Sequence, residues 1–149
     1  RSCLIVGTLS TELVLFNLLS IVLSFFIFLK SDKNLSILSV GDNVSAITDA
    51  MSNHCSNRSI SYVFITGGLG PTDDDCTYEA VKSFLRSDEY LDKVYLDELK
   101  DKFFHSQQKS DKLIIKQAMK LDAVQYLPNP SGTAMPMVFT KKKTTFLCL

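Results

Sequence analysis

The segment best suited to chemistry is a run of glycines followed by acidic residues. Gly67, Gly68 and Gly70 stand between an apolar stretch and a segment with helical periodicity, and Pro71 fixes the exit of the loop. Free backbone N–H groups and the positive end of a helix, brought together at such a loop, favour a phosphate or a similar anion. Glycine also lets the main chain approach a ligand closely. The segment predicts a phosphate-binding loop, although a tight turn would explain the glycines about as well.

Three consecutive carboxylates, those of Asp73, Asp74 and Asp75, follow this loop directly. Carboxylates repel a bound anion unless a cation bridges them, and Mg²⁺ is commonly held between carboxylates and phosphates. We therefore expect these aspartates to share Mg²⁺ or another divalent cation with the bound anion. In the alternative interpretation, Thr72 and one aspartate cap the helix, and the other carboxylates interact with its positive end.

The loop belongs to an alternation of predicted strands and helices. Short apolar runs predict strands, and apolar residues at steps of three and four predict helices. Asp42 or Asn43 is expected to cap a helix that includes residues 44–51. Such alternation favours a mainly parallel sheet covered by helices. The predicted strands are residues 2–6, 35–40, 62–65, 124–127, 136–140 and 145–148, and the further helices are residues 77–85, 90–105 and 112–120.

Length and composition restrict the class of protein. The chain has 149 residues, 46% of them hydrophobic, which suits a single domain over residues 1–149. Its 16 basic and 16 acidic residues cancel, so nucleic acid is not an expected partner. The 4 cysteines lack metal-ligand spacing, and we expect reduced thiols and a cytoplasmic location. Because the chain starts at Arg1 and stops at Leu149 within a predicted strand, we expect a fragment truncated at both ends.

Residues 13–29 differ from the rest of the chain. Only Asn17, Ser20 and Ser24 interrupt a run of mostly large apolar side chains. The run is at the short edge for a membrane span, and no small-residue cleavage site of a signal peptide follows it. We interpret it as a buried helix, with membrane insertion and a retained intron as alternatives.

The run TGGLGPTDDDCTYEAV at residues 66–81 resembles the GGxGPTxDDxT signature of the MoaB/Mog-like (molybdopterin-binding) superfamily. The likeness is strongest to CinA-type proteins and to the N-terminal domain of eukaryotic FAD synthase. The KQA of residues 116–118, followed by PNPSGTA at residues 128–134, is similar to a CinA-type arrangement. The VGT at residues 6–8 and the VGDN at residues 40–43 resemble earlier family segments. The resemblance therefore covers nearly the whole chain.

The sequence departs from the family pattern at three places. Leu9 stands where the family has an acidic residue, and Asn17-Leu18-Leu19 replaces an Asn-Thr-Asn-like segment. The family's Pro-Gly-x-Pro motif would begin just beyond Leu149.

The resemblance implies a three-layer α/β/α fold with a mainly parallel sheet. It implies that Asp74 and Asp75 are catalytic residues as well as metal ligands, that Glu79 supports the loop together with Thr77, and that a turn faces the loop. The residues implied to bind the ligand are Gly67, Gly68, Gly70, Pro71, Thr72 and Thr77, with Gly132 and Thr133 as the facing wall.

The implied function is that of a nucleotide-handling domain in flavin metabolism. Loop amides and Mg²⁺ would neutralise the pyrophosphate of FAD or ADP-ribose while water attacks a phosphorus, as in a hydrolase. The TYEAV of residues 77–81 favours the FAD synthase type, and PNPSGTA favours the CinA type. One alternative is a molybdopterin adenylyltransferase-type enzyme binding a pterin, against which Leu69 counts because such members more often have GGTG. The other is a binding module without catalysis. Relatives commonly form symmetric oligomers, so a homo-oligomer is also expected.

Overall fold

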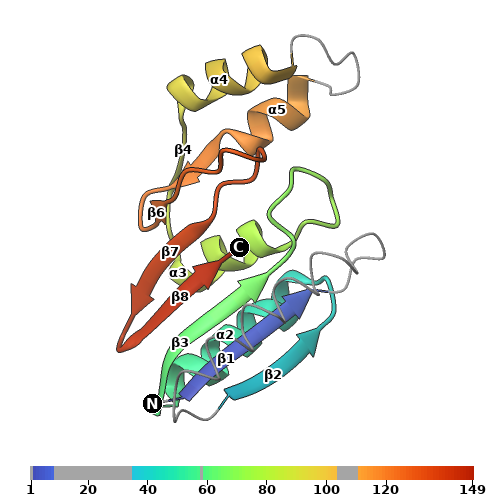
Figure 1. Cartoon of the computed structure of the whole chain (residues 1–149). Coiled ribbons are helices and arrows are strands. Elements are labelled where there is room, and N and C mark those ends of the chain that lie inside the picture. The colour runs from blue at the N-terminus through green and yellow to red at the C-terminus, as the bar shows by residue number, and fades with distance from the viewer. Residues whose placement is uncertain (1, 9–34, 58, 104–110) are drawn as a thin grey trace.

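The computed structural model describes residues 2–8, 35–57, 59–103 and 111–149, which form a mixed α/β fold (Figure 1). Its six-stranded sheet has the order β2-β1-β3-β8-β7-β6. The pairings from β2 across to β8 are parallel, whereas β7 and β6 are added in antiparallel fashion. The predicted α/β class with a mainly parallel sheet is confirmed. The strands are β1 (Ser2–Thr8), β2 (Leu35–Val40), β3 (Ile60–Thr66), β6 (Gln125–Tyr126), β7 (Met137–Lys141) and β8 (Thr144–Cys148).

Strand β3 illustrates why the sheet forms here. Its β-branched and aromatic residues suit a pleated, half-buried surface. Val63 and Ile65 are fully buried on one face, whereas Tyr62 projects from the other face and is 43% exposed. The strands predicted over residues 136–140 and 145–148 correspond to β7 and β8, which form a hairpin whose turn includes Lys142 with a left-handed φ of 55°.

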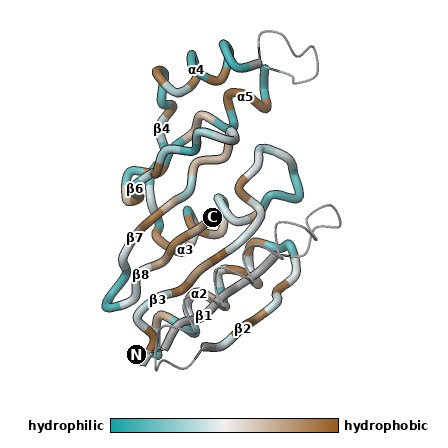
Figure 2. Tube along the Cα trace, in the orientation of Figure 1, coloured by the Kyte–Doolittle hydropathy of each residue, from teal (hydrophilic) through white to brown (hydrophobic). Residues whose placement is uncertain are grey.

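Helices α2 (Val44–Ser56) and α3 (Thr77–Leu85) pack together on one face of the sheet. Asn43 begins α2, because its side-chain oxygen accepts hydrogen bonds from the N–H groups of Ser45 and Ala46. Apolar residues are concentrated along β3, β7 and β8, while the loop after β3 is hydrophilic (Figure 2). The largest fully buried side chains of this core are Phe146, Ile47, Met51, Ile65, Leu121, Met137, Val63 and Val81.

A smaller cluster lies beyond the end of this sheet (Figure 1). It combines α4 (Lys93–Phe103) and α5 (Asp111–Gln117) with a two-stranded antiparallel sheet. Strand β4 (Glu89–Leu91) pairs there with β5 (Met119–Leu121). The buried side chains of this cluster are Tyr95, Leu96, Leu99, Ile114 and Ala118.

The helix predicted over residues 90–105 is wrong at its start. Tyr90 lies in β4, and the helix begins only at Lys93. Asp92 fixes that start, because its carboxylate accepts a hydrogen bond from the N–H of Tyr95 at 3.0 Å. Residues 104 and 105 of this prediction lie outside the described residues.

Two other predicted elements are too long. The helix predicted over residues 112–120 ends at Gln117, and Lys120 lies in β5, where it pairs with Tyr90. The strand predicted over residues 124–127 is reduced to Gln125–Tyr126. Short strands of this kind cannot be separated from helix by periodicity alone, because too few residues show the pattern.

Lys120 ties the smaller cluster to the main body. Its ammonium group pairs with Asp92 at 2.6 Å and lies over the rings of Tyr95 and Tyr126, 5.1 and 5.2 Å from their centroids. The Tyr126 hydroxyl in turn accepts a hydrogen bond from the N–H of Leu121. These contacts link β5 and the start of α4 to β6, the edge strand of the sheet.

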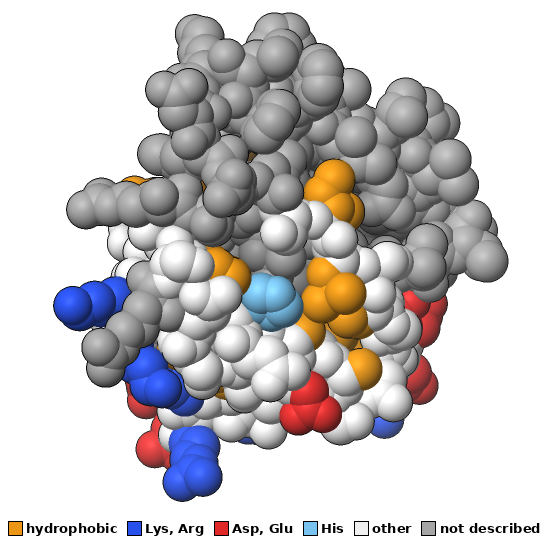
Figure 3. Space-filling view, turned by 90° about the horizontal axis from the view of Figure 1, so that it is seen from below, with side chains coloured by type: hydrophobic (Ala, Val, Ile, Leu, Met, Phe, Trp, Pro, Cys, Tyr) orange, Lys and Arg blue, Asp and Glu red, His pale blue; other side chains and the backbone are white. Residues whose placement is uncertain are grey.

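The predictions for residues 13–29 lie outside the described residues. In the part of the chain that is described, no helix has the length and apolar character needed to cross a membrane. On the face seen in Figure 3, acidic, basic and hydrophobic side chains all occur.

Candidate functional site

The glycine loop connects β3 to α3, as predicted. Gly67 and Gly68 have left-handed φ angles of 92° and 68°. The buried Thr77 holds the loop, because its hydroxyl donates to the carbonyl of Gly67 at 2.8 Å and its N–H donates to that of Gly68 at 3.0 Å. A Cβ on Gly68 would lie 2.7 Å from Thr77 Oγ1. Glycine is therefore required at this close approach.

Several main-chain amides of the loop have no partner within the described residues. The N–H of Gly67 donates to the carbonyl of Leu149, next to the end of β8. Among the described residues, by contrast, the N–H groups of Gly68, Leu69 and Gly70 have no hydrogen-bond partner. Consecutive free amides in a glycine turn form the type of concavity that binds anions.

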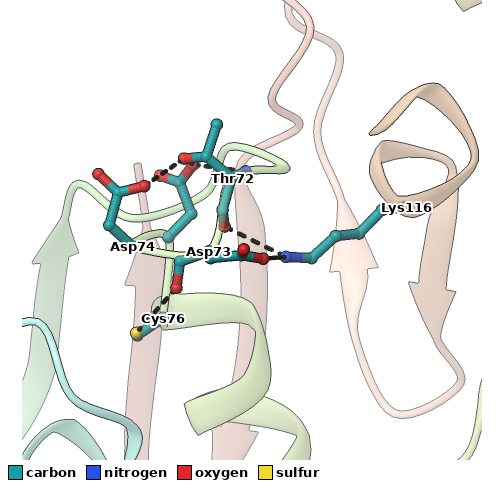
Figure 4. A network of polar contacts seen from close by, with 6 residues as sticks. Thr72, Asp73, Asp74, Cys76 and Lys116 are labelled. Atoms are coloured by element: carbon teal, nitrogen blue, oxygen red, sulfur yellow. Dashed lines mark hydrogen bonds and ion pairs between the residues drawn. The ribbon is translucent and has the colours of Figure 1, made fainter. Parts of the chain in front are cut away.

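Thr72 lies between two carboxylates (Figure 4). Its hydroxyl oxygen is 2.6 Å from Asp74 Oδ1 and 2.5 Å from Asp75 Oδ2, and its N–H donates to Asp75 Oδ2 at 3.0 Å. A hydroxyl has one proton to donate, so it can satisfy only one of the two carboxylates. The remaining contact brings two electron-rich oxygens together, which a cation between them would stabilise.

The donor set at this point suits a hard cation. Carboxylate and hydroxyl oxygens are ligands that Mg²⁺ prefers, and Mg²⁺ is usually bound by one or two carboxylates together with substrate phosphates and water. Within the described residues no group of 3 or more His, Cys, Asp and Glu side chains could hold a metal ion. Any cation at Asp74, Asp75 and Thr72 would therefore need further oxygen ligands from a bound phosphate or from water.

Electrostatics keep one of these carboxyl groups ionised. The hydrogen bond from Thr72, followed by that from its own main chain, lowers the pKa of Asp74 below its usual value of 3.8. The nearby thiol of Cys76 behaves in the opposite way, because burial, followed by the negative charge of Asp42, raises its pKa. The Asp74 carboxylate is thus negatively charged over the whole physiological pH range, and Cys76 is a protonated thiol.

The acidic residues do not cap the helix. Cys76 is the N-cap of α3, and no side chain makes a capping hydrogen bond there. Asp74 and Asp75 instead accept hydrogen bonds from Thr72. The alternative interpretation, in which Thr72 and an aspartate cap α3, is therefore wrong, because the carboxylates turn back toward the loop.

Lys116 reaches the loop from α5. Its ammonium group donates to the carbonyl of Thr72 at 3.1 Å and lies 3.8 Å from Asp73 Oδ1 (Figure 4). The Asp73 side chain is fully exposed and makes no other ion pair among the described residues. Lys116 thus places a positive charge beside the acidic end of the loop.

A hollow lies between the loop and the smaller cluster. Part of it is open to solvent. Glu79, for which the family resemblance implied support of the loop, lines this hollow and makes no hydrogen bond to the loop within the described residues. The full lining is Leu69, Gly70, Asp75, Tyr78, Glu79, Lys116, Gln117, Met119, Lys120, Tyr126, Met135 and Met137.

Gly132 and Thr133 are not among the residues that line this hollow. Gly132 belongs to a turn in which its N–H donates to the side chain of Asn129. The carbonyl of Thr133 accepts a hydrogen bond from the Tyr95 hydroxyl at 2.6 Å, which joins this turn to α4. Further along the same segment, Met135 and Met137 line the hollow.

Sequence reasoning gave no role to Lys116 or Gln117, although both belong to the KQA segment that carries part of the family resemblance. Gln117 donates from Nε2 to the carbonyl of Leu69 at 3.3 Å. The signal that could have identified them is the adjacency of a cation and an amide at the end of a predicted helix. Their contact with the loop depends on tertiary packing.

The sequence is similar to a known family and to bacterial proteins. Residues 34–149 match the family described as "Probable molybdopterin binding domain". The chain is 35% identical over 100 residues to a CinA-like protein of Microcystis aeruginosa, an alignment that covers 67% of this chain and 24% of that protein. A CinA-like protein of Acaryochloris marina is 36% identical over 100 residues, and this alignment covers 67% of this chain and 23% of that protein. The chain therefore spans about a quarter of the length of the curated relatives it matches.

Solved structures share the fold. CinA from Thermoplasma acidophilum superposes with a TM-score of 0.72 at 22% identity, covering 100% of this chain and 88% of that one. A molybdenum cofactor biosynthesis protein B superposes with a TM-score of 0.53 at 16% identity, and the superposition covers 99% of this chain and 78% of that one. The predicted likeness to CinA-type and MoaB/Mog-like proteins is confirmed. The chain belongs to the family of molybdopterin-binding domains of the MoaB/Mog-like type.

Proposed function

We propose that this chain binds the pyrophosphate group of a nucleotide such as FAD or ADP-ribose at its glycine loop and takes part in its metal-dependent hydrolysis. The observation that carries the proposal is the adjacency of two features. The amides of Gly68, Leu69 and Gly70 lack partners among the described residues, and the oxygens of Asp74 and Asp75 crowd the Thr72 hydroxyl beside them. The first feature suits an anion and the second suits a cation.

Each group would have a distinct part in binding. The loop amides would donate hydrogen bonds to phosphate oxygens, and Lys116 would add a positive charge from α5. Asp74 and Asp75 would hold a divalent cation. This cation would neutralise part of the negative charge of the pyrophosphate. In the hydrolysis, the oxygen of water forms a bond to one phosphorus and the bridging P–O bond breaks, giving two monophosphates. The low pKa of Asp74 keeps its carboxylate ionised for this role.

The alternative function is a molybdopterin adenylyltransferase-type reaction. It is favoured by the family description and by the molybdenum cofactor biosynthesis protein among the structures with this fold. A binding module without catalysis would use the same loop. FAD synthase-type activity and a cytoplasmic location stay predictions, as does a homo-oligomer.

The test measures hydrolysis of FAD and ADP-ribose with Mg²⁺ or with EDTA, together with the effect of Mg²⁺ on pyrophosphate binding. The variants are Asp74→Asn and Asp75→Asn, and Asp73→Asn is the matched control because its carboxylate is fully exposed and contacts only Lys116. We expect Asp74→Asn and Asp75→Asn to lose both the hydrolysis and the effect of Mg²⁺ on pyrophosphate binding. Asp73→Asn should keep both. The free energy of unfolding should change by less than about 1 kcal/mol in all three. Hydrolysis that resists EDTA, or Mg²⁺-dependent binding that survives both substitutions, would contradict the metal role.

A further inference from the structure

Asp92 makes three contacts where the elements of the smaller cluster meet. Its N–H donates to the carbonyl of Ala118, the residue that follows α5, at 3.1 Å. Its carboxylate accepts a hydrogen bond from the N–H of Tyr95, in the first turn of α4, at 3.0 Å. The same carboxylate accepts another from the ammonium group of Lys120, in β5, at 2.6 Å. One residue therefore joins the start of α4 to the end of α5 and to the strand that follows it.

The ion pair between Lys120 and Asp92 is shielded from water. The two side chains are 12% and 22% exposed, and the rings of Tyr95 and Tyr126 lie beside the ammonium group. The hydrogen bond from Lys120 is the main cause that lowers the pKa of Asp92 below its usual value of 3.8, so the carboxylate is ionised at neutral pH. Salt screens a partly buried pair less than an exposed one, and the pair therefore holds β5 firmly against α4.

Lys116 reaches the glycine loop from the end of α5 with a long, flexible side chain. Its ammonium group donates to the carbonyl of Thr72 at 3.1 Å and lies 3.8 Å from Asp73 Oδ1, yet the side chain is still 38% exposed. Fixing a lysine side chain costs conformational entropy, and a partly exposed ion pair offsets little of that cost. The place of this charge therefore depends on how firmly α5 itself is held.

We propose that Asp92 and Lys120 are positioning residues, which hold the end of α5 and with it the ammonium group of Lys116 beside the glycine loop for anion binding. This inference rests on the proposed function, which puts a pyrophosphate on that loop. The sign of the charge on Asp92 makes the proposal testable. A carboxylate repels an anion, so Asp92 can favour anion binding only through the groups that it holds in place.

The experiment measures the affinity of inorganic pyrophosphate by calorimetric titration in Mg²⁺. Asp92→Asn removes the negative charge but keeps a side-chain oxygen for the N–H of Tyr95, because asparagine is also a good helix cap. Asp97→Asn is the matched control, since it removes the same charge from α4 at a carboxylate that is 77% exposed. Electrostatics alone would leave binding unchanged or slightly tighter in both variants. Positioning predicts weaker binding in Asp92→Asn, by at least about twofold, and no loss in Asp97→Asn.

Combination with Lys116→Met shows whether Asp92 acts through Lys116. Lys116→Met alone should weaken pyrophosphate binding about two- to fivefold, the scale of an interaction between partly exposed charges. Adding Asp92→Asn should cause no further loss, because the charge that it positions is gone. Lys120→Met should behave in the same way, and it tests the proposal independently of Asp92→Asn. Lys120 also lines the hollow, but a direct attraction between its charge and the anion would persist in the Lys116→Met background.

Two results would overturn the inference. One is unchanged or tighter pyrophosphate binding in Asp92→Asn, and the other is a loss from Asp92→Asn or Lys120→Met that persists in the Lys116→Met background. In both cases the parent chain still binds pyrophosphate, so only the positioning role fails. Absence of pyrophosphate binding to the parent would reject the proposed function, and the inference with it.

Discussion

Replacement of Gly70 by alanine is expected to disturb the acidic end of the loop while leaving the fold nearly intact. A Cβ at Gly70 would lie 2.9 Å from Cγ of Asp75 and closer still to Oδ2, so this carboxylate must move away. The movement breaks the hydrogen bond from the N–H of Thr72 to Asp75 Oδ2. One such bond contributes about 1 kcal/mol, which is the expected fall in the free energy of unfolding.

The assay pairs urea denaturation with calorimetric titration of ADP-ribose in Mg²⁺. Gly41→Ala is the matched control, because a Cβ at Gly41 meets no atom within 4 Å. We expect Gly70→Ala to weaken binding at least about tenfold, equivalent to about 1.4 kcal/mol, and Gly41→Ala to change neither quantity. Unchanged affinity in Gly70→Ala would refute the reasoning. So would a loss of stability above about 3 kcal/mol, which would mean that the loop as a whole had collapsed.

Further predictions concern Gly68, Thr77 and Thr72. Gly68→Ala should lower the free energy of unfolding by at least about 1 kcal/mol in urea denaturation, because φ is 68° and the new Cβ meets Thr77. Thr77→Val should cost about 1–3 kcal/mol in the same assay, because the carbonyl of Gly67 loses its buried donor. Thr72→Val should raise the Asp74 pKa toward 3.8 in a carbon-13 NMR titration, since the Thr72 hydrogen bond is the main cause of the lowered value. In the parent this interaction stabilises the fold above about pH 4, and the contribution is lost as the pH falls through the lowered pKa.

The elements that are long or bounded by distinctive residues could be predicted from the sequence. The apolar run of β3, its glycines and the periodicity of α3 place the loop correctly between strand and helix. Asn43 was one of the two expected caps of α2. In these cases the local pattern and the tertiary environment favour the same structure.

The short strands and the side-chain contacts of the site depend on tertiary packing, which the local sequence pattern does not reveal. Strands β4 and β5 have 3 residues each and are defined by pairing with one another, so residues such as Tyr90 and Lys120 were assigned to helices. The direction of the Asp75 carboxylate, toward Thr72 rather than the helix end, is set by the turn. Gln117 contacts Leu69, which lies 48 positions earlier in the sequence. Side-chain direction and long-range packing thus decide the composition of the site.

The account depends most directly on whether the glycine loop binds a nucleotide pyrophosphate. The measurement is calorimetric titration of the parent chain with FAD, ADP-ribose and ATP in Mg²⁺, after circular dichroism has shown that the sample is folded. Saturable heat with at least one of these ligands, weakened in EDTA and in Gly70→Ala but not in Gly41→Ala, is the predicted result. A folded sample that gives no heat with any of the three ligands would contradict the account.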